Sequence, residues 1–318
     1  MPSKKYTSRK RAEIKREKIK QQKGSNFPAL IVIVIVVITA IGGLYFVFFS
    51  GSQTDNNAPI LTEDYYVKAK NDAAEIIDVL ANDVDPDNDN LSIVSYDPPA
   101  HGSIDIILGQ MYYAPETDFT GVDIFEYTVS DGTTEKTSKI HIIIPDLYPV
   151  ALIDTTLGTI VLELYDDKCP MTCANFINLS NDGFYDGMNF YRIKNDFMIQ
   201  AGRYYPDGSQ ATSPYGTVNF EATSEILHED GTISMARGED INSASAEFFI
   251  CDGAQRGLDD DYLQEYYDAR GYTAFGKTID GLDVVHTIAE QPHDNSHTAG
   301  GGKPYTDIVI NSITVKNY

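Results

Sequence analysis

Hydrophobic and polar residues follow three successive patterns along the chain. Residues 29–49 form a run without a charged side chain, dominated by Ile and Val. Residues 58–146 place apolar residues at every second position, between short turn-prone sequences, which is typical of strands. From residue 150 onward this alternation is interrupted by two segments with helical spacing, one that begins at Pro170 and one over 281–290. The patterns predict a mainly β protein.

The apolar run at residues 29–49 is long enough to cross a membrane as a helix. At about 1.5 Å of rise per residue it spans about 31 Å, close to the hydrocarbon thickness of a bilayer. A cleavable signal peptide is the alternative, but its apolar region would be about 7–15 residues long and would end at small residues. This run instead ends in the aromatic-rich segment 45–49. We therefore expect an uncleaved transmembrane signal anchor.

Charge differs sharply on the two sides of this run. Residues 1–28 contain ten Lys or Arg and two Glu, whereas the whole chain has a formal net charge of −23. The positive-inside rule then predicts a single-pass cell-membrane protein with a cytoplasmic N-terminus and the bulk of the chain outside. Such an acidic chain excludes a nucleic-acid binder that works by bulk electrostatics. With only three Cys, no disulfide framework is expected.

The patterns divide the chain into five expected parts. They are a basic cytoplasmic tail (1–28), a transmembrane anchor (29–49), a polar linker (50–57), a β-sandwich (58–146) and a C-terminal domain (147–318). Strands at regular spacing with turn signals between them favour the sandwich. In the C-terminal domain, two helices and about eight strands predict a closed barrel that is capped by the helices.

Several short motifs in the sandwich region resemble the bacterial cadherin-like or Ig-like repeats of surface proteins. They include DVLANDVDPD at 78–87, DFTG at 118–121 and YTVSDG at 127–132. The resemblance covers nearly all of residues 58–146. It implies a β-sandwich that serves as a spacer or as an adhesion module.

Four aspartates of this region occupy alternate positions, namely Asp83, Asp85, Asp87 and Asp89. In an extended chain they would project on one side and could gather around calcium, which prefers oxygen ligands. The EF-hand motif is excluded because Val94 stands at the place of its bidentate Glu. A solvated loop rich in Asx turns explains the same residues without a metal. Both interpretations stay open.

The most informative stretch is FYRIKNDFMIQAG at residues 190–202. It strongly resembles the cyclophilin signature F-x-R-I-x-x-x-F-M-x-Q-x-G, and further motifs between residues 150 and 318 follow in the family's order. The resemblance implies a cyclophilin-like closed eight-stranded barrel and peptidyl-prolyl cis/trans isomerisation of X-Pro-containing polypeptides, with no cofactor required. Without catalysis, X-Pro bonds isomerise in tens of seconds, because the amide loses its resonance when it twists.

The same resemblance assigns the site residues. Arg192 is expected to donate to the prolyl nitrogen, which becomes basic only when the amide twists, and Gln200 to bind the substrate carbonyl. Taken alone, an Arg between Tyr and Ile on a strand would be read as a surface charge. The residues expected to bind substrate are Phe197, Met198, Phe249 and Leu258 around the proline ring, the Ala236–Arg237 backbone along the peptide, Glu247 and Tyr272.

Three positions depart from the usual pattern of the family. Glu247 stands where Gln is usual, and it is expected either to pair with Arg192 or to attract basic substrates. Gly257 stands where members that bind cyclosporin tightly have Trp, so strong drug binding is not expected. Tyr272 replaces a common active-site His and keeps a ring with a polar tip.

An extra acidic stretch at residues 260–270 leaves a second alignment open, in which Tyr262–Leu263 and not Leu258 forms the wall of the proline slot. Cys169 and Cys173 are either a strained disulfide or, as their spacing favours, small buried residues. His293 and His297, near a run of three glycines, either contact a metal or belong to a surface loop, and the loop is favoured.

These features together predict a membrane-anchored, extracytoplasmic isomerase that assists the folding of exported or cell-surface proteins. The alternative comes from another class of function. In it, the chain is a surface binding or adhesion protein whose cyclophilin fold holds proline-containing peptides with little turnover.

Overall fold

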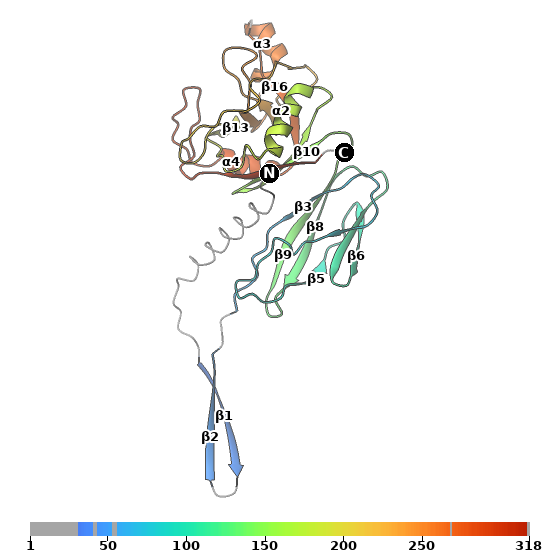
Figure 1. Cartoon of the computed structure of the whole chain (residues 1–318), viewed down its shortest axis with the longest axis vertical. Helices are drawn as coiled ribbons and strands as arrows, with labels where there is room; N and C mark the ends of the chain where they lie inside the picture. Colours follow the sequence, from blue (N-terminus) through green and yellow to red (C-terminus); the bar gives the residue numbers. More distant parts are fainter. Residues whose placement is uncertain (1–30, 41–42, 53–55, 268, 317–318) are drawn as a thin grey trace.

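The computed structural model describes residues 31–40, 43–52, 56–267 and 269–316 (Figure 1). The basic tail predicted at 1–28 lies outside these residues, as does part of the predicted linker.

The apolar run forms two antiparallel strands, β1 (Ile31–Ala40) and β2 (Gly43–Ser52), which pair from Ile31↔Ser52 to Ala40↔Gly43. The helix predicted over 29–49 is therefore wrong for this structure. The run is dominated by β-branched Ile and Val, whose stiff side chains favour extended backbone over helix. Within the described part of the chain, no helix is both long and apolar enough to cross a membrane.

The predicted sandwich is confirmed, with two sheets packed over one core (Figure 1). One sheet has the order β3-β9-β8-β5, in which β3 and β9 run parallel, and the other has the order β4-β7-β6. Alternate residues of β8 are buried, and Tyr113 and Tyr127 are among the largest fully buried side chains. The strands are β3 (Asp64–Val67), β4 (Glu75–Ile77), β5 (Ser92–Tyr96), β6 (Gly102–Ile107), β7 (Gln110–Pro115), β8 (Gly121–Ser130) and β9 (Glu135–Ile144).

The C-terminal domain contains one eight-stranded sheet with the order β12-β13-β15-β14-β16-β11-β10-β17. All pairings in it are antiparallel. The edge strands β12 and β17 do not pair with each other, so the prediction of a closed barrel is wrong and the sheet is an open half-barrel. The strands are β10 (Val150–Thr155), β11 (Gly158–Leu164), β12 (Arg192–Lys194), β13 (Met198–Ala201), β14 (Thr232–Met235), β15 (Phe248–Cys251), β16 (Thr273–Asp280) and β17 (Ile310–Lys316).

A glycine-rich loop occupies the edge of β12. The N–H of Ile193 donates to the carbonyl of Gly302 at 3.0 Å, and the N–H of Gly302 donates back at 3.1 Å. Gly301 has a φ of +77°, and a Cβ there would lie 2.4 Å from the carbonyl oxygen of Ile193. Only glycine allows this close approach. The approach also brings the loop to the functional site.

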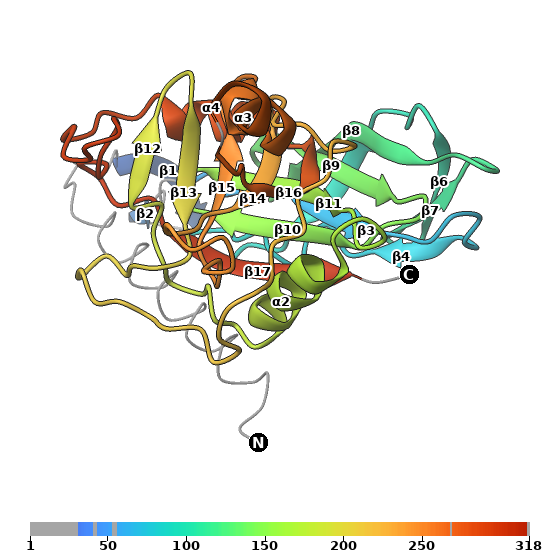
Figure 2. The ribbon, with the colours of Figure 1, turned by 90° about the horizontal axis from the view of Figure 1, so that it is seen from above.

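In the described part of the C-terminal domain, three α-helices accompany the sheet, whereas two were predicted. They are α2 (Pro170–Asn181), α3 (Asp260–Tyr267) and α4 (Leu282–Ala289), and a short 3-10 turn, η1 (Arg256–Leu258), precedes α3. Figure 2 shows α2 and α4 on opposite sides of the sheet. The unexpected helix α3 forms in the acidic insertion, where Asp260 and Asp261 in the first turn favour a helix start. Cys169 and Cys173 are free and buried, as their spacing predicted.

The sandwich and the C-terminal domain share a small apolar contact. Ile143 of β9 packs with Val150 and Val161 of the following domain, and all three are fully buried. Next to them, Nδ1 of His141 lies 2.6 Å from Oδ2 of Asp280. The contact joins the two units directly.

Candidate active site

One pocket of about 320 Å³ opens on the C-terminal domain and gathers all the residues that were expected to contact substrate. It is lined by Tyr191, Arg192, Phe197, Met198, Gln200, Arg203, Ala236, Arg237, Glu247, Phe249, Leu258, Tyr272, His297 and Ala299.

The hairpin of β12 and β13 positions the first group of these side chains. Arg192 pairs directly with Gln200 across the two strands. The turn between the strands contains Asp196 with a φ of 56°, a conformation that Asn and Asp adopt more readily than bulky residues. Phe197 follows in the turn, and Met198 opens β13. The spacing of the motif therefore sets the register of the site.

Arg192 is half-buried, and its guanidinium is held in place from two sides. Its Nε and Nη2 donate to the carbonyl of Gly300 at 3.1 and 3.0 Å, and Nη2 also donates to Ala299 at 3.3 Å. Its Nη1 donates to Oε1 of Gln200 at 3.3 Å. Burial lowers the pKa of Arg192, but an Arg stays charged in proteins. The result is a partly desolvated cation at a fixed position beside the ring of Phe197, whose centroid lies 5.6 Å from Cζ.

An apolar floor lies next to this cation. Met198 and Phe249 are buried there, and Phe197, Leu258 and Tyr272 pack against them. Leu258 lines the pocket, whereas Tyr262–Leu263, on α3, do not. The structure thus places Leu258 where the first alignment expected it, and its contact with the proline ring stays a prediction.

The side chain of Tyr272 is placed by contacts on both of its sides. Its ring makes an edge contact with Phe249, with the ring centroids 5.7 Å apart, and Cζ of Arg237 lies 5.1 Å from its centroid. Arg237 also donates through Nε to the carbonyl of Gly271 at 2.9 Å. The side chain of Arg237 thus holds the segment that carries Tyr272, and both Arg237 and Ala236 line the pocket.

Glu247 belongs to a polar network that does not include a direct bond to Arg192. Its Oε1 accepts from Nη1 of Arg203 at 2.9 Å, and its Oε2 accepts from the hydroxyl of Tyr191 at 2.5 Å and from Nε2 of Gln200 at 3.2 Å. Of the two roles expected for this carboxylate, pairing with Arg192 is therefore wrong. The amide of Gln200 also donates to Tyr191, so both of its N–H groups already have partners.

A buried polar chain supports Phe249 from below. Nδ1 of His228 lies 2.8 Å from Oδ1 of Asp259, and its Nε2 lies 3.0 Å from Oγ of Ser234. The imidazole stacks on Phe249 with the ring planes 13° apart. Burial lowers the pKa of His228. A neutral imidazole that bridges two hydrogen-bond partners fixes the position of the aromatic ring above it.

Four lining residues were not predicted from the sequence: Tyr191, Arg203, His297 and Ala299. Tyr191 and Arg203 flank the signature motif, so their positions offered a signal. His297 was considered only as a metal ligand or as part of a surface loop. In the structure that loop borders the pocket, and burial followed by the nearby charge of Arg192 lowers the pKa of His297.

The four aspartates considered for calcium do not lie along an extended strand. Oδ1 of Asp83 accepts from the N–H of Thr62 at 3.0 Å. Oδ1 of Asp85 accepts from the N–H groups of Asp87 at 2.8 Å and Asp89 at 3.0 Å, which is the Asx-turn arrangement of the alternative interpretation. The carboxylates of Asp83 and Asp85 thus act as acceptors for backbone within a turn-rich loop. Calcium binding there stays a prediction.

Comparisons with known proteins agree with this geometry. Residues 150–315 match the family described as cyclophilin type peptidyl-prolyl cis-trans isomerase/CLD, and residues 56–143 match the bacterial Ig domain. Peptidyl-prolyl cis-trans isomerase B of Escherichia coli is 35% identical over 51% of this chain and 96% of its own length. Peptidyl-prolyl cis-trans isomerase A of Dickeya dadantii is 37% identical over 52% of this chain and 81% of its own length.

A crystal structure of a Cryptosporidium parvum cyclophilin in the presence of the dipeptide Ala-Pro shows 29% identity, with a TM-score of 0.45. It covers 53% of this chain and 99% of that one.

The half-barrel and its pocket thus define an enzyme of the peptidyl-prolyl cis/trans isomerase class. The chain belongs to the cyclophilin family, and it carries a bacterial Ig domain before the isomerase domain.

Replacing Glu247 with Gln should change the charge preference of the pocket. Glu247 offsets Arg203, and without it the cations of the pocket have no carboxylate partner among its lining residues. One unit charge near the surface changes the attraction of a charged substrate side chain by on the order of 0.5–1 kcal/mol. We expect kcat/KM for peptides with Glu before Pro to rise about 2–5-fold relative to peptides with Lys there.

The matched control for this substitution is Glu126→Gln, which removes an exposed carboxylate from the sandwich. Its substrate preference should equal that of the unsubstituted chain. Added salt should reduce the effect of Glu247→Gln, because salt screens interactions between exposed charges. An unchanged preference at low salt would show that Glu247 does not influence substrate charge.

Proposed function

We propose that this chain is a membrane-anchored, extracytoplasmic isomerase that accelerates X-Pro isomerisation in exported or cell-surface proteins as they fold. The observation that carries the catalytic part is the half-buried guanidinium of Arg192 beside an apolar pocket. The substrates would be polypeptides with accessible X-Pro bonds.

The catalytic step needs no covalent bond between enzyme and substrate. The pyrrolidine ring would enter the apolar pocket formed by Phe197, Met198 and Phe249, where burial of its methylene groups favours binding. As the amide twists, the prolyl nitrogen loses its conjugation and gains a lone pair that accepts a hydrogen bond. A guanidinium already held in position would donate to this lone pair in the transition state and not in the planar ground state. That difference lowers the barrier.

Gln200 and the strand at Ala236 would orient the peptide. The N–H of Ala236 already donates to the carbonyl of Glu247 at 2.9 Å, so pairing with an extended peptide would use the Ala236 carbonyl and the Arg237 N–H. For Gln200 to bind the substrate carbonyl, its amide would exchange one of its present partners for the substrate. Its Oε1 would keep its contact with Arg192 throughout.

The membrane part of the proposal is supported by the sequence. Residues 29–49 lack charge and follow ten Lys or Arg within residues 1–28. We propose that this uncharged run holds the chain at the membrane, with the basic segment on the cytoplasmic side. The sandwich would then hold the isomerase domain away from the lipid surface.

Cell fractionation tests this location. The full chain should stay in the membrane pellet after an alkaline wash, and protease added outside should digest the part after residue 55 while it spares the tail. Val37→Lys should shift the chain to the soluble fraction, because a charge at the centre of a span costs about 2.5–3.5 kcal/mol of insertion. Val37→Leu, the matched control, should behave like the original chain. Recovery of the unsubstituted chain in the soluble fraction would disprove the anchor.

The alternative function, peptide binding with little turnover, makes a different prediction for the same pocket. A peptide would then bind tightly while its cis/trans exchange rate stayed at the uncatalysed value. Rates measured with the full chain on cis X-Pro peptides separate the two functions, and the decisive variant is Arg192→Ala.

A further inference from the structure

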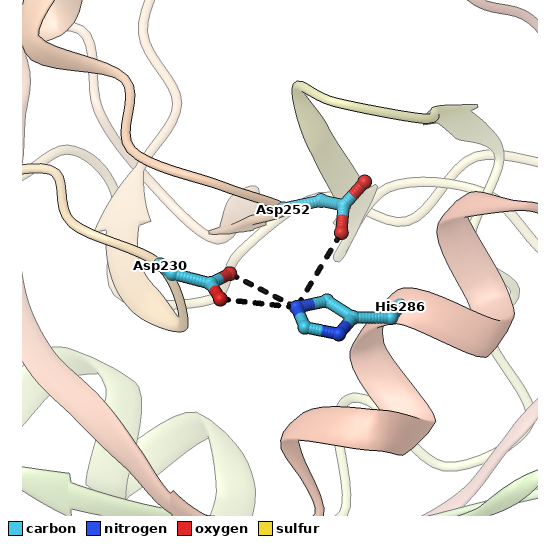
Figure 3. Close-up of side chains that lie close together, drawn as sticks. All are labelled: Asp230, Asp252 and His286. Carbon is cyan, nitrogen blue, oxygen red and sulfur yellow. Dashed lines mark hydrogen bonds and ion pairs between the residues drawn. The ribbon is translucent and has the colours of Figure 1, made fainter.

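Three potential metal ligands converge outside the substrate pocket, at Asp230, Asp252 and His286 (Figure 3). Asp230 lies just before β14, Asp252 directly follows β15, and His286 is on α4. Their ligand atoms lie within 4.8 Å of one another, and none of the three residues lines the pocket. Within residues 56–267 and 269–316, no other group of three His, Cys, Asp or Glu converges in this way.

The distances from His286 to the two carboxylates are close to those between ligand atoms around a small divalent cation. Nε2 of His286 lies 3.1 Å from each oxygen of Asp230 and 3.7 Å from Oδ1 of Asp252. When a tetrahedral ion holds its ligand atoms at about 2.0–2.2 Å, any two of these ligand atoms lie about 3.3–3.6 Å apart. An ion at the centre would therefore require only small movements of the side chains.

A backbone N–H donates to one oxygen of each carboxylate and fixes its position. The N–H of Gly253 donates to Oδ1 of Asp230 at 2.8 Å, and the N–H of Asp196 donates to Oδ2 of Asp252 at 2.7 Å. The second oxygens, Oδ2 of Asp230 and Oδ1 of Asp252, lie 3.1 and 3.7 Å from Nε2 of His286. Hydrogen bonds that orient the ligands in this way are typical of metal sites.

Charge balance also favours a divalent cation in this cluster. One imidazolium neutralises only one of the two carboxylates, and the side chain of Asp252 is 7% exposed, so water solvates its charge poorly. A divalent cation bound by neutral imidazole would neutralise both. The side chains of Asp230 and His286 are 39% and 41% exposed. This exposure leaves a path by which an ion can enter and room for water ligands.

We propose that Asp230, Asp252 and His286 bind one zinc-type divalent cation, with water completing its coordination. The mixed nitrogen and oxygen ligands favour Zn²⁺ or a similar first-row ion over Ca²⁺ and Mg²⁺, which prefer oxygen alone. The site lies beside the turn that presents Phe197, because the N–H of Asp252 donates to the carbonyl of Phe197 at 3.0 Å. The ion would join this turn to α4.

Equilibrium dialysis of the full chain in detergent against Zn²⁺ tests the site. The original chain should bind one equivalent of Zn²⁺. His286→Ala and Asp230→Asn should each lower the affinity for Zn²⁺ by about 10–100-fold. Zn²⁺ should also raise the melting temperature of the original chain, because a ligand that binds only the folded state stabilises it. Ca²⁺ and Mg²⁺ at the same concentration should not displace the bound Zn²⁺.

His101→Ala is the matched control, because the side chain of His101 is 45% exposed and its Nδ1 lies 3.6 Å from one carboxylate oxygen of Glu116. This variant should still bind one equivalent of Zn²⁺. Isomerase activity without metal should be the same in all of these chains, which verifies that they are folded. Equal Zn²⁺ uptake by the original chain and by both site variants would overturn the proposal, as would no uptake by the original chain.

Discussion

Arg192→Ala is expected to lower kcat/KM on cis X-Pro peptides by about 100–1,000-fold, the range measured when one preorganised donor to a transition state is removed. A guanidinium has five N–H groups. In the described part of the chain, Gly300, Ala299 and Gln200 accept from four of them, which leaves one Nη1 hydrogen for the prolyl nitrogen. The loss should fall mainly on kcat, because the contact strengthens only as the amide twists.

Arg192→Lys is the informative companion to this variant. Lysine keeps the positive charge, but its single ammonium cannot bond the loop carbonyls and Gln200 while it donates to the substrate. Its activity should therefore be intermediate. Both variants should bind the peptide with nearly unchanged affinity, since the apolar pocket remains. Equal rates for Arg192→Ala and the original chain would reject this mechanism and would favour the peptide-binding alternative.

The part of the site that could be predicted is the part that local spacing determines. Arg192 and Gln200 lie eight residues apart around one turn, so strand pairing places them opposite each other wherever the hairpin forms. The alternation of residues along strands likewise identified the sandwich and the strands of the isomerase domain. Such patterns depend on neighbours along the chain and can be read without tertiary structure.

Contacts between distant segments explain what could not be predicted. Gly300, which accepts from Arg192, is 108 residues away from it, and no local pattern connects the two. The same loop occupies the edge of β12. The strand count suggested a closed barrel because a count does not reveal which segment lies at that edge. Glu247 illustrates the same limit, because it pairs with Arg203, which lies 44 residues away along the chain, and not with Arg192.

The second large effect is expected at Asp64, in the core of the sandwich. Its carboxylate, Oδ2 of Asp83 and the carbonyl of Val79 all face the hydroxyl of Tyr127, at 2.8, 3.2 and 3.0 Å. One hydroxyl proton cannot satisfy three acceptors. Burial raises the pKa of Asp64 to about 7, in spite of the hydrogen bond from Tyr127, and the nearby charge of Asp83 adds to the rise. The folded sandwich therefore favours a protonated Asp64.

Asp64→Asn should accordingly stabilise the chain at neutral and alkaline pH. The folded state keeps the proton up to about pH 7, whereas the unfolded state releases it near 3.8, so stability falls as the pH rises between these values. The full difference corresponds to on the order of 4 kcal/mol. The gain should be smaller than this full difference, because the amide nitrogen of Asn cannot accept the hydrogen bonds that a carboxylate oxygen accepts. We expect the free energy of unfolding at pH 8 to rise by about 1–3 kcal/mol.

Calorimetry of the full chain between pH 4 and pH 8 measures this effect, and the variant should show a flatter pH dependence over that range. Asp131→Asn provides a control of opposite sign. Hydrogen bonds from the Thr134 backbone and from Asn56 lower the pKa of Asp131, so its loss should destabilise the chain at neutral pH. The two substitutions make the same chemical change in one domain. If Asp64→Asn had the same pH dependence as the original chain, the proton on Asp64 would have no part in stabilising the sandwich.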